Sequence, residues 1–252
     1  MTDIPIDHPR YHSLLTRERI VEGVNIGITS MQGLVAQGRG ECFDYMLGEK
    51  TNHFAEDAIK VAAAMLLLAE KPIISVNGNT AALVPEQMIR LSKITGASLE
   101  VNLFHRTEER IKRITNHLLA HGASSVLGSA GDETLPLSHD RGIVDKGGIF
   151  SADVVLVPLE DGDRCETLVS MGKKVITIDL NPLSRTSLAA TVSIVDNVVR
   201  ALDGIADAAL EIQDWDREKM ERLVESYNNK DILRKSLAAI NSNLRYMADE
   251  VL

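Results

Sequence analysis

Residues 72–79 read Pro72-Ile73-Ile74-Ser75-Val76-Asn77-Gly78-Asn79, an apolar run that ends in three turn-forming residues. A short aliphatic run bounded by Asn and Gly is typical of a buried strand, here Ile73–Val76. Asn77 can cap a helix that begins directly after it. The segment therefore predicts a strand, a tight turn and a helix in succession, which is the repeating unit of a parallel α/β fold.

The same unit recurs along the chain after residue 72. Aliphatic runs alternate with stretches of helical periodicity, and buried parallel strands have this aliphatic composition. We therefore expect an α/β fold with a Rossmann-like, mostly parallel sheet flanked by helices. The candidate strands are Ile73–Val76, Leu99–Leu103, Ser125–Leu127, Val154–Pro158, Val175–Ile178 and Val192–Val195.

Helical patterns flank this region on both sides. Apolar residues at helical spacing predict one helix from Ser13 to Leu34. Gly38-Arg39-Gly40-Glu41 predicts a break, and Asn52 can cap a second helix. Beyond about residue 200 the pattern is wholly helical.

We expect a single α/β domain over residues 1–252. It would carry an N-terminal helical segment at about 1–70 and a C-terminal helical extension at about 200–252. Residues 129–148 are rich in Gly, Asp and Ser, and they predict a long connection or lid rather than regular structure.

Composition narrows the class of protein. The 252-residue chain is 44% hydrophobic, which is enough for a large core without disulfides, and its net charge of −9 argues against binding to nucleic acid. Cys42 and Cys165 lack the spacing of a metal or redox pair. No apolar run approaches the roughly 18 residues that span a bilayer. We expect a cytoplasmic protein that binds small molecules, with no membrane partner.

Two common nucleotide-binding motifs are missing. The sequence has no G-x-x-x-x-G-K-[ST] segment, and no G-x-G-x-x-G follows a predicted strand. The segment most like these motifs is Gly128-Ser129-Ala130-Gly131, but its glycines have the wrong spacing. A nucleotide would therefore bind through a less familiar arrangement, and the missing glycines count against a Rossmann-type oxidoreductase.

Polar residues follow several predicted strands, at the sheet edge where open α/β sheets bind ligands. Asn77 and Asn79 open a helix whose N–H groups could hold an anion, or they form an ordinary capped turn. His105 and Arg106 follow the next strand, and they either bind substrate or begin a surface helix.

The segment Glu160-Asp161-Gly162-Asp163-Arg164 follows the predicted strand Val154–Pro158. Its three carboxylates could hold Mg²⁺, which prefers oxygen ligands and bridges nucleotide phosphates. The alternative is a solvated acidic turn that precedes a helix. Asp161 and Arg164 are kept as candidate substrate-binding residues, and the residues that would bind a metal remain open.

The run Asp179-Leu180-Asn181-Pro182-Leu183-Ser184-Arg185-Thr186 is the clearest candidate for an active-site segment. An acidic residue at a strand end can accept hydrogen bonds from ribose hydroxyls, and Arg185 offers a planar fork of donors to phosphate. The alternative is an Asx turn fixed by Pro182, with Arg185 in solvent. Arg39 stands between two glycines, which permits close approach to a ligand.

Six segments in unbroken order, within about residues 5–200, resemble the archaeal phosphopantothenate synthetases, also called 4-phosphopantoate:β-alanine ligases. The matching segments are His8-Pro9-Arg10-Tyr11, Gly38-Arg39-Gly40-Glu41-Cys42-Phe43-Asp44-Tyr45, Ser75-Val76-Asn77-Gly78-Asn79, Glu100-Val101-Asn102-Leu103-Phe104-His105-Arg106-Thr107, Leu156-Val157-Pro158-Leu159-Glu160-Asp161-Gly162-Asp163-Arg164 and Asp179 through Thr186. The chain departs from the family pattern at Gln37 and Cys42, which puts only details near Arg39 in doubt.

The resemblance implies an ATP-dependent, homodimeric ligase of coenzyme A biosynthesis that joins 4-phosphopantoate to β-alanine and releases AMP and pyrophosphate. A mechanism through an acyl-adenylate would use Mg²⁺ and arginines, with Arg39 and Arg185 as catalytic candidates. Arg106 and Arg164 are candidates for binding the substrate phosphate. The resemblance associates ATP binding with Arg17, Arg39, Asp179, Leu180, Asn181, Arg185, Thr186, Asn197 and Val198.

Two other functions compete with this interpretation. A Rossmann-type oxidoreductase would carry bound nicotinamide. A non-catalytic nucleotide-sensing module would bind ATP without turning it over. Pyrophosphate release that depends on both 4-phosphopantoate and β-alanine distinguishes the ligase from both.

Overall fold

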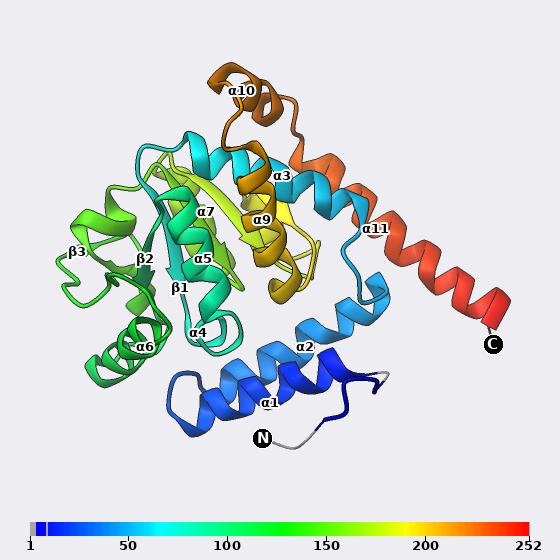
Figure 1. The fold of residues 1–252 in the computed structure, drawn as a ribbon, viewed down its shortest axis with the longest axis horizontal. Helices are drawn as coiled ribbons and strands as arrows, with labels where there is room; N and C mark the ends of the chain where they lie inside the picture. Colours follow the sequence, from blue (N-terminus) through cyan, green and yellow to red (C-terminus); the bar gives the residue numbers. More distant parts are fainter. Residues whose placement is uncertain (1–3, 9, 252) are drawn as a thin grey trace.

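A computed structural model describes residues 4–8 and 10–251, so Pro9 of the matching segment at 8–11 lies outside the described residues. Its centre is a five-stranded sheet with the order β2-β1-β5-β6-β7, in which all neighbours are parallel (Figure 1). This confirms the α/β class and the mostly parallel sheet. The strands are β1 (Pro72–Val76), β2 (Ser98–Val101), β5 (Val154–Pro158), β6 (Lys174–Ile178) and β7 (Val192–Ile194).

The predicted strand at Ser125–Leu127 is wrong. Only Leu127 pairs, through an isolated parallel bridge to Glu100. Gly128, with φ of +111°, turns the chain away at once. A Cβ on Gly128 would lie 2.3 Å from the carbonyl oxygen of Val101, so the chain passes too close to the sheet edge for a longer strand.

The strand order places a topological switch point between β1 and β5. From β1 the chain moves outward to β2, and it then returns to the other side of β1 to form β5, β6 and β7. Loops that leave the carboxyl ends of β1 and β5 diverge at such a point, and ligands of open α/β sheets bind in the resulting crevice.

Helices cover both faces of the sheet (Figure 1). Ile74 and Leu156 face a core shared with α3 (His53–Leu68), α5 (Pro85–Thr95) and α9 (Val198–Ile212). Their neighbours Ile73 and Val155 face the opposite way, toward α7 (Gly162–Ser170). Side chains of a strand alternate between the two faces, which is why aliphatic residues fill every position of these buried strands.

The N-terminal segment forms two helices, α1 (Tyr11–Asn25) and α2 (Met31–Leu47), so the single helix predicted from Ser13 to Leu34 is wrong. Gly27, with φ of +74°, breaks the pattern after α1. Ser30 then caps α2 by accepting a hydrogen bond from the N–H of Gly33.

The predicted break at residues 38–41 is also wrong, because this segment lies inside α2. Each glycine costs a helix about 1 kcal/mol, and the contacts of Gly33 with Asn79 and of Asp44 with Asn197 and Arg200 offset that cost. Gly33 shows the benefit of a missing side chain, since a Cβ there would lie 2.3 Å from Oδ1 of Asn79. Asn52 precedes α3 as expected, but its side chain donates to Leu47 and Lys50 carbonyls and does not cap the helix.

The remaining elements agree broadly with the sequence pattern. The predicted helical end forms α9, α10 and α11, and α11 extends away from the sheet (Figure 1). Residues 129–148 contain only the two-residue strands β3 and β4, a 3-10 helix at Asp140–Gly142 and the start of a short helix at Lys146–Phe150, as expected for a long connection. Within the described chain no helix is long and apolar enough to cross a membrane. These elements are α4 (Gly78–Leu83), α6 (Glu108–Ala120), β3 (Glu133–Thr134), β4 (Ile143–Val144), α8 (Arg185–Ala189), α10 (Arg217–Glu225) and α11 (Asn229–Tyr246).

Candidate active site

A cleft of about 730 Å³ lies along the carboxyl edge of the sheet. The loops that follow all five strands contribute to it, and the sheet order places them side by side from the β2 end to the β7 end. The residues that we use to mark these loops are His105 after β2, Asn77 and Asn79 after β1, Asp161 after β5, Asp179 through Thr186 after β6, and Asn197 after β7.

Helix α2 closes the cleft from the side opposite the sheet. Near its start, the carbonyl of Gly33 accepts a hydrogen bond of 2.8 Å from Nδ2 of Asn79. Near its end, Asp44 accepts one of 2.8 Å from Nδ2 of Asn197 and pairs with Arg200 at 2.6 Å. The helix therefore runs along the sheet edge from the β1 loop to the β7 loop.

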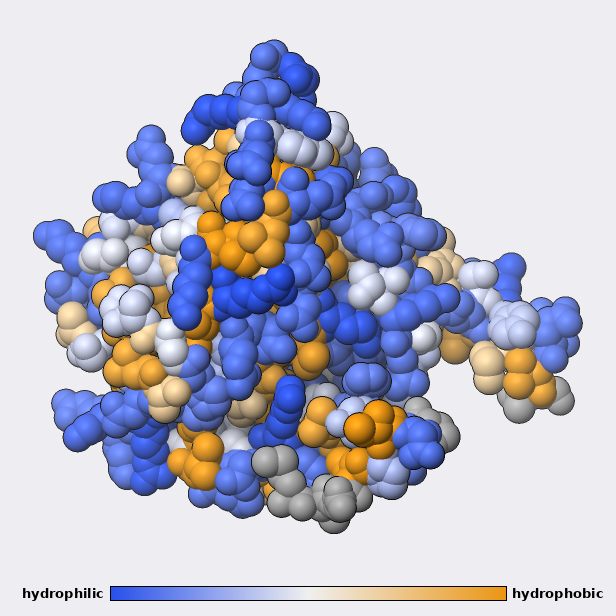
Figure 2. Space-filling view, in the orientation of Figure 1, coloured by the Kyte–Doolittle hydropathy of each residue, from blue (hydrophilic) through white to orange (hydrophobic). Residues whose placement is uncertain are grey.

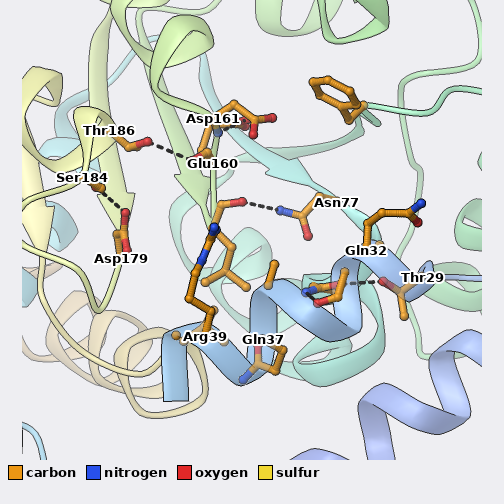
Figure 3. Close-up of a pocket in the computed structure, with 18 of the residues that line it drawn as sticks. Thr29, Gln32, Gln37, Arg39, Asn77, Glu160, Asp161, Asp179, Ser184 and Thr186 are labelled. Carbon is orange, nitrogen blue, oxygen red and sulfur yellow. Dashed lines mark hydrogen bonds between the residues drawn. The ribbon is translucent and has the colours of Figure 1, made fainter. Parts of the chain in front are cut away.

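Asp179 organises the loop after β6. One carboxylate oxygen accepts a hydrogen bond of 2.9 Å from the N–H of Asn181, and the other accepts one from the hydroxyl of Ser184 (Figure 3). Burial raises the pKa of Asp179, while the Ser184 hydroxyl and the charge of Arg39 oppose that rise. The Asx turn that was the alternative interpretation is present, and the same segment lines the cleft.

Arg39 extends from α2 into the cleft, toward the loops that carry Asp179 and Glu160 (Figure 3). No carboxylate in the described parts of the chain forms an ion pair with it. Its charge acts on Asp179 only at a distance, by opposing the rise in pKa that burial causes. A guanidinium held in a cleft without a carboxylate partner is suited to an anionic ligand.

Arg185 and Thr186 lie at the start of α8. Arg185 is mostly exposed at the rim of the cleft and pairs with Glu166 at 2.6 Å. Gly162 makes room for it, because a Cβ on Gly162 would lie 2.3 Å from the Cβ of Arg185. The hydroxyl of Thr186 donates to the carbonyl of Glu160 at 2.8 Å, which joins the β5 and β6 loops (Figure 3).

The other predicted ATP-binding residues fall into two groups. Leu180, Asn181, Asn197 and Val198 line the cleft, and Asn197 also caps α9. Arg17 does not line it. Arg17 lies on α1 and pairs with Glu41 of α2 at 3.1 Å, so its assignment stays a prediction from the family resemblance.

Four of the six candidate substrate-binding residues line the cleft: Asn77, Asn79, His105 and Asp161. Asn77 spans the switch point, since its Nδ2 donates to the carbonyl of Pro158 at 2.8 Å (Figure 3).

Arg106 and Arg164 do not line the cleft, so they are poor candidates for the substrate phosphate. Arg106 donates to the carbonyl of Gly128 at 2.8 Å. Arg164 is fully buried, forms an ion pair with Glu160 and donates a hydrogen bond to the hydroxyl of Ser75.

Two arginines that the sequence did not indicate line the cleft instead. Arg110 comes from α6, and its Nη1 donates to the carbonyl of His105 at 2.9 Å. Arg141 comes from the long 129–148 segment and pairs with Glu160 and Asp161, each at 2.8 Å. The expectation that this segment is functional was the only available signal for Arg141.

Three buried polar side chains hold the 129–148 segment against the sheet. The two carboxylate oxygens of Glu100 accept hydrogen bonds from the N–H groups of Asp145 and Ile149. Asp145 in turn accepts from the N–H groups of Gly128 and Gly131, each at 2.7 Å. Asn102 donates to the carbonyls of Arg141 and Ile143. These buried hydrogen bonds therefore fix the path of the chain around Arg141.

Glu100 should make stability depend on pH. Its burial, helped by the charge of Asp145, raises its pKa from 4.5 to about 7 against the effect of its two N–H donors. Between these pH values the folded chain binds more protons than the unfolded chain, so the free energy of unfolding should fall as the pH rises. The fall should be at most about 3 kcal/mol. Urea unfolding at pH 5 and pH 8 measures this fall in the free energy of unfolding. An equal fall in Glu100→Gln would show that Glu100 is not its cause.

The three carboxylates after β5 do not gather around one point. Glu160 pairs with Arg141 and Arg164, Asp161 pairs with Arg141, and Asp163 lies 2.9 Å from a ring nitrogen of His139. Among residues 4–8 and 10–251, no group of three His, Cys, Asp or Glu side chains could hold a metal ion.

Known proteins match the chain over nearly its full length. A family model described as phosphopantothenate/pantothenate synthetase matches residues 54–243. A 4-phosphopantoate–β-alanine ligase from Methanosarcina mazei is 58% identical over 99% of both chains. Proteins of the same name from Thermococcus kodakarensis (50% identity, 99% of this chain and 97% of the relative) and Methanospirillum hungatei (49% identity, 98% and 100%) are also similar. With this match covering most of its length, the chain belongs to the phosphopantothenate/pantothenate synthetase family.

Proposed function

We propose that this protein joins 4-phosphopantoate to β-alanine at the expense of ATP, forming 4′-phosphopantothenate, AMP and pyrophosphate in coenzyme A biosynthesis. The observation that carries the proposal is the cleft itself, which holds Arg39, Arg110, Arg141 and Arg185 at the switch point of the sheet. Two of the three substrates carry phosphate, and all three are acidic or small. The names of the relatives at 49–58% identity support the same reaction.

We place ATP at the β6 and β7 end of the cleft. Asp179, Asn181 and Thr186 come from the β6 loop, and Asn197 and Val198 from the β7 loop. The amino terminus of α9 begins at Val198, where the helix dipole favours a negative ligand. Arg39 reaches the same region from α2 and is suited to the phosphate chain.

The chemistry proceeds in two transfers. A carboxylate oxygen of 4-phosphopantoate attacks the α-phosphorus of ATP, and the bond from that phosphorus to the bridging oxygen breaks to release pyrophosphate. The neutral amine of β-alanine then attacks the acyl carbon, the bond to AMP breaks, and the nitrogen loses a proton. Arg39 and Arg185 offset charge on the phosphates, while α2 shields the reactants from water. No enzyme side chain forms a covalent bond.

The cleft is compatible with Mg²⁺. This ion usually binds one or two protein carboxylates and otherwise substrate phosphates and water. Asp161 is the candidate ligand, since it lines the cleft, and Mg²⁺ would bind there in competition with the ion pair of 2.8 Å between its Oδ2 and Nε of Arg141. Burial raises the pKa of Asp161, and a nearby cation would favour its charged form. Mg²⁺ bound there would neutralise charge on the nucleotide phosphates.

Pyrophosphate release tests the proposed function directly. Purified protein with ATP and Mg²⁺ should release pyrophosphate only when both 4-phosphopantoate and β-alanine are present. No release with pure substrates would refute the ligase proposal. ATP binding without release would favour the nucleotide-sensing alternative, and a bound nicotinamide absorbance would favour the oxidoreductase.

Arg185→Ala should weaken ATP binding modestly and leave the fold intact. The side chain is exposed and already paired with Glu166, so solvent screens its contribution, and we expect an affinity loss of about threefold to tenfold. Isothermal titration with a non-hydrolysable ATP analogue measures it. Unchanged affinity would show that Arg185 is only a surface residue that holds α8 against α7.

We also propose that the protein is a cytoplasmic homodimer. The face shown in Figure 2 is largely hydrophilic with several apolar groups, and one of these lies at the free end of α11. Exposed apolar residues on or next to this helix include Leu237, Leu244, Tyr246 and Met247. A second copy would cover such a surface. Light scattering should give twice the mass of one chain, and the mass of a single chain at micromolar concentration would contradict the proposal.

A further inference from the structure

A buried charged cluster holds the end of α2 that lies nearest the β7 loop. We propose that Asp44 and Arg200 are positioning residues that clamp α2 onto the start of α9. The clamp holds Arg39 of α2 and Asn197 of the β7 loop in the relative positions that ATP requires. Neither Asp44 nor Arg200 lines the cleft. The inference rests on the proposed function and concerns how its nucleotide site is assembled.

Helix α2 has little apolar contact to fix its place. Of its 17 residues, the buried ones are Asp44 and Leu47, while Leu34 and Phe43 are only partly buried. Burial of an apolar face is what usually holds a surface helix on a domain. The position of α2 therefore depends on polar contacts, such as those of Gly33 and Asp44 described above.

Arg200 lies between two buried carboxylates. Its Nη2 is 2.6 Å from a carboxylate oxygen of Asp44 and 2.6 Å from one of Asp196. Asp196 also accepts a hydrogen bond of 2.6 Å from the hydroxyl of Thr51, which lies between α2 and α3. Asp44 is 5% exposed and Asp196 is 1% exposed, so these ion pairs are screened little by salt. One guanidinium therefore joins α2 to the β7 loop and the start of α9.

Asp44 also orients the amide of Asn197. Its Oδ2 accepts a hydrogen bond of 2.8 Å from Nδ2 of Asn197, and the amide oxygen accepts one of 3.1 Å from the N–H of Val199. A carboxylate only accepts hydrogen bonds, so the nitrogen of the amide must face Asp44. The second N–H of that nitrogen remains for a ligand. Asn197 lines the end of the cleft that we assign to ATP.

The position of Arg39 depends on the same contact. Arg39 has no ion-pair partner within the described chain, so the backbone of α2 sets its place in the cleft. Asp44 follows it by five residues, which corresponds to about 7.5 Å along the helix axis and about 140° around it. Asp44 can therefore face α9 while Arg39 faces the cleft. Release of α2 at Asp44 would displace Arg39, and a displacement of about 1 Å can lower a rate about 100-fold.

A double-mutant cycle tests whether Asp44 acts through Arg39. We expect Asp44→Ala to weaken binding of a non-hydrolysable ATP analogue at least about fivefold and to lower kcat at least about tenfold. In an Arg39→Ala background the same change should cost no more than about threefold in kcat, because the arginine to be positioned is absent. A loss as large as in the wild type would overturn the proposal, as would wild-type affinity and kcat in Asp44→Ala.

Asp44→Ala should fold, because Arg200 keeps the carboxylate of Asp196. Asp44→Asn is the conservative variant. It retains an oxygen that can accept from Asn197 but loses the charge that pairs with Arg200, so it should recover part of the activity. The same cycle can be run with this variant if the alanine variant unfolds.

Asp207→Ala is the matched control. Asp207 lies on α9 and forms an interhelical pair with Arg90 that is also 2.6 Å long, outside the cleft. Its loss should leave kcat and affinity for the ATP analogue within about twofold of the wild type.

Hydrogen exchange tests the clamp without substrates. In the ligand-free protein, Asp44→Ala should speed exchange of the backbone amides in about residues 40–47 at least about tenfold, and Asp207→Ala should not. Unchanged exchange in this part of α2 would overturn the clamp. Absence of pyrophosphate release by the wild type would instead refute the ligase reaction, and hydrogen exchange and nucleotide affinity would still decide the role of Asp44.

Discussion

Arg39→Ala is expected to lower kcat/KM for the ligase reaction by about 100-fold or more. Arg39 is a cleft cation without a carboxylate partner in the described chain, so its charge is available to the nucleotide phosphates. Removing one preorganised donor from a site where charge develops costs about 2.7–4 kcal/mol of transition-state stabilisation. Initial rates of pyrophosphate release measure the loss. The side chain makes no hydrogen bond within the described residues, so the unfolding temperature should stay near that of the wild type.

Arg90→Ala serves as the control for this prediction. Arg90 lies on α5 and pairs with Asp207 on α9, outside the cleft, so its loss should leave the rate nearly unchanged. Arg39→Lys should recover part of the activity, because it restores the charge without the planar fork. An Arg39→Ala enzyme with wild-type kcat/KM would show that Arg39 does not act on the reacting phosphates.

Glu160→Ala should cause the largest loss of stability. Its side chain is almost fully buried and pairs with two guanidinium groups, those of Arg141 and Arg164. Its removal would leave Arg164 charged, fully buried and without a carboxylate partner. Breaking a buried pair in this way costs about 3–5 kcal/mol, which corresponds to an unfolding temperature lower by roughly 10 °C. Scanning calorimetry and urea unfolding provide the two measurements.

The double variant Glu160→Ala/Arg164→Met separates charge from packing. Replacing both partners by apolar groups removes the buried charge, so this protein should regain much of the stability that Glu160→Ala loses. If the double variant loses as much free energy of unfolding as the two single variants lose together, the broken ion pair is not the cause of the instability of Glu160→Ala. Activity should remain low in both, because Arg141 loses one of the two carboxylates that hold it.

Local sequence predicted the sheet and the segment Asp179–Thr186 because both depend on residues close in the chain. An aliphatic run forms a buried strand in almost any parallel sheet, and the turn after it necessarily lies at the carboxyl edge. That is why Asn77, Asn79, Asp161 and Asp179 all line the cleft as expected.

The predictions that were wrong share a different cause, which is contact between residues that lie far apart in the sequence. Gly38 and Gly40 indicate a break by propensity, and the distant contacts of α2 with Asn79 and Asn197 override them. Arg164 and Arg185 look alike in sequence, since each follows a strand-end turn, yet one is buried and the other exposed. Arg110 reaches a carbonyl that lies 82 residues earlier in the chain. No local pattern reports such a contact.

The position of α2 has a consequence for the order in which the protein folds. This helix is synthesised before every strand that it later covers, and its contact from Asp44 to Asn197 spans 153 residues. Such a long closure carries a large entropic cost, so we expect the cleft to form only after the β7 loop has left the ribosome. Substrates that bridge α2 and the strand ends would then stabilise the completed protein by mass action. A nascent chain shorter than about residue 200 should bind no nucleotide.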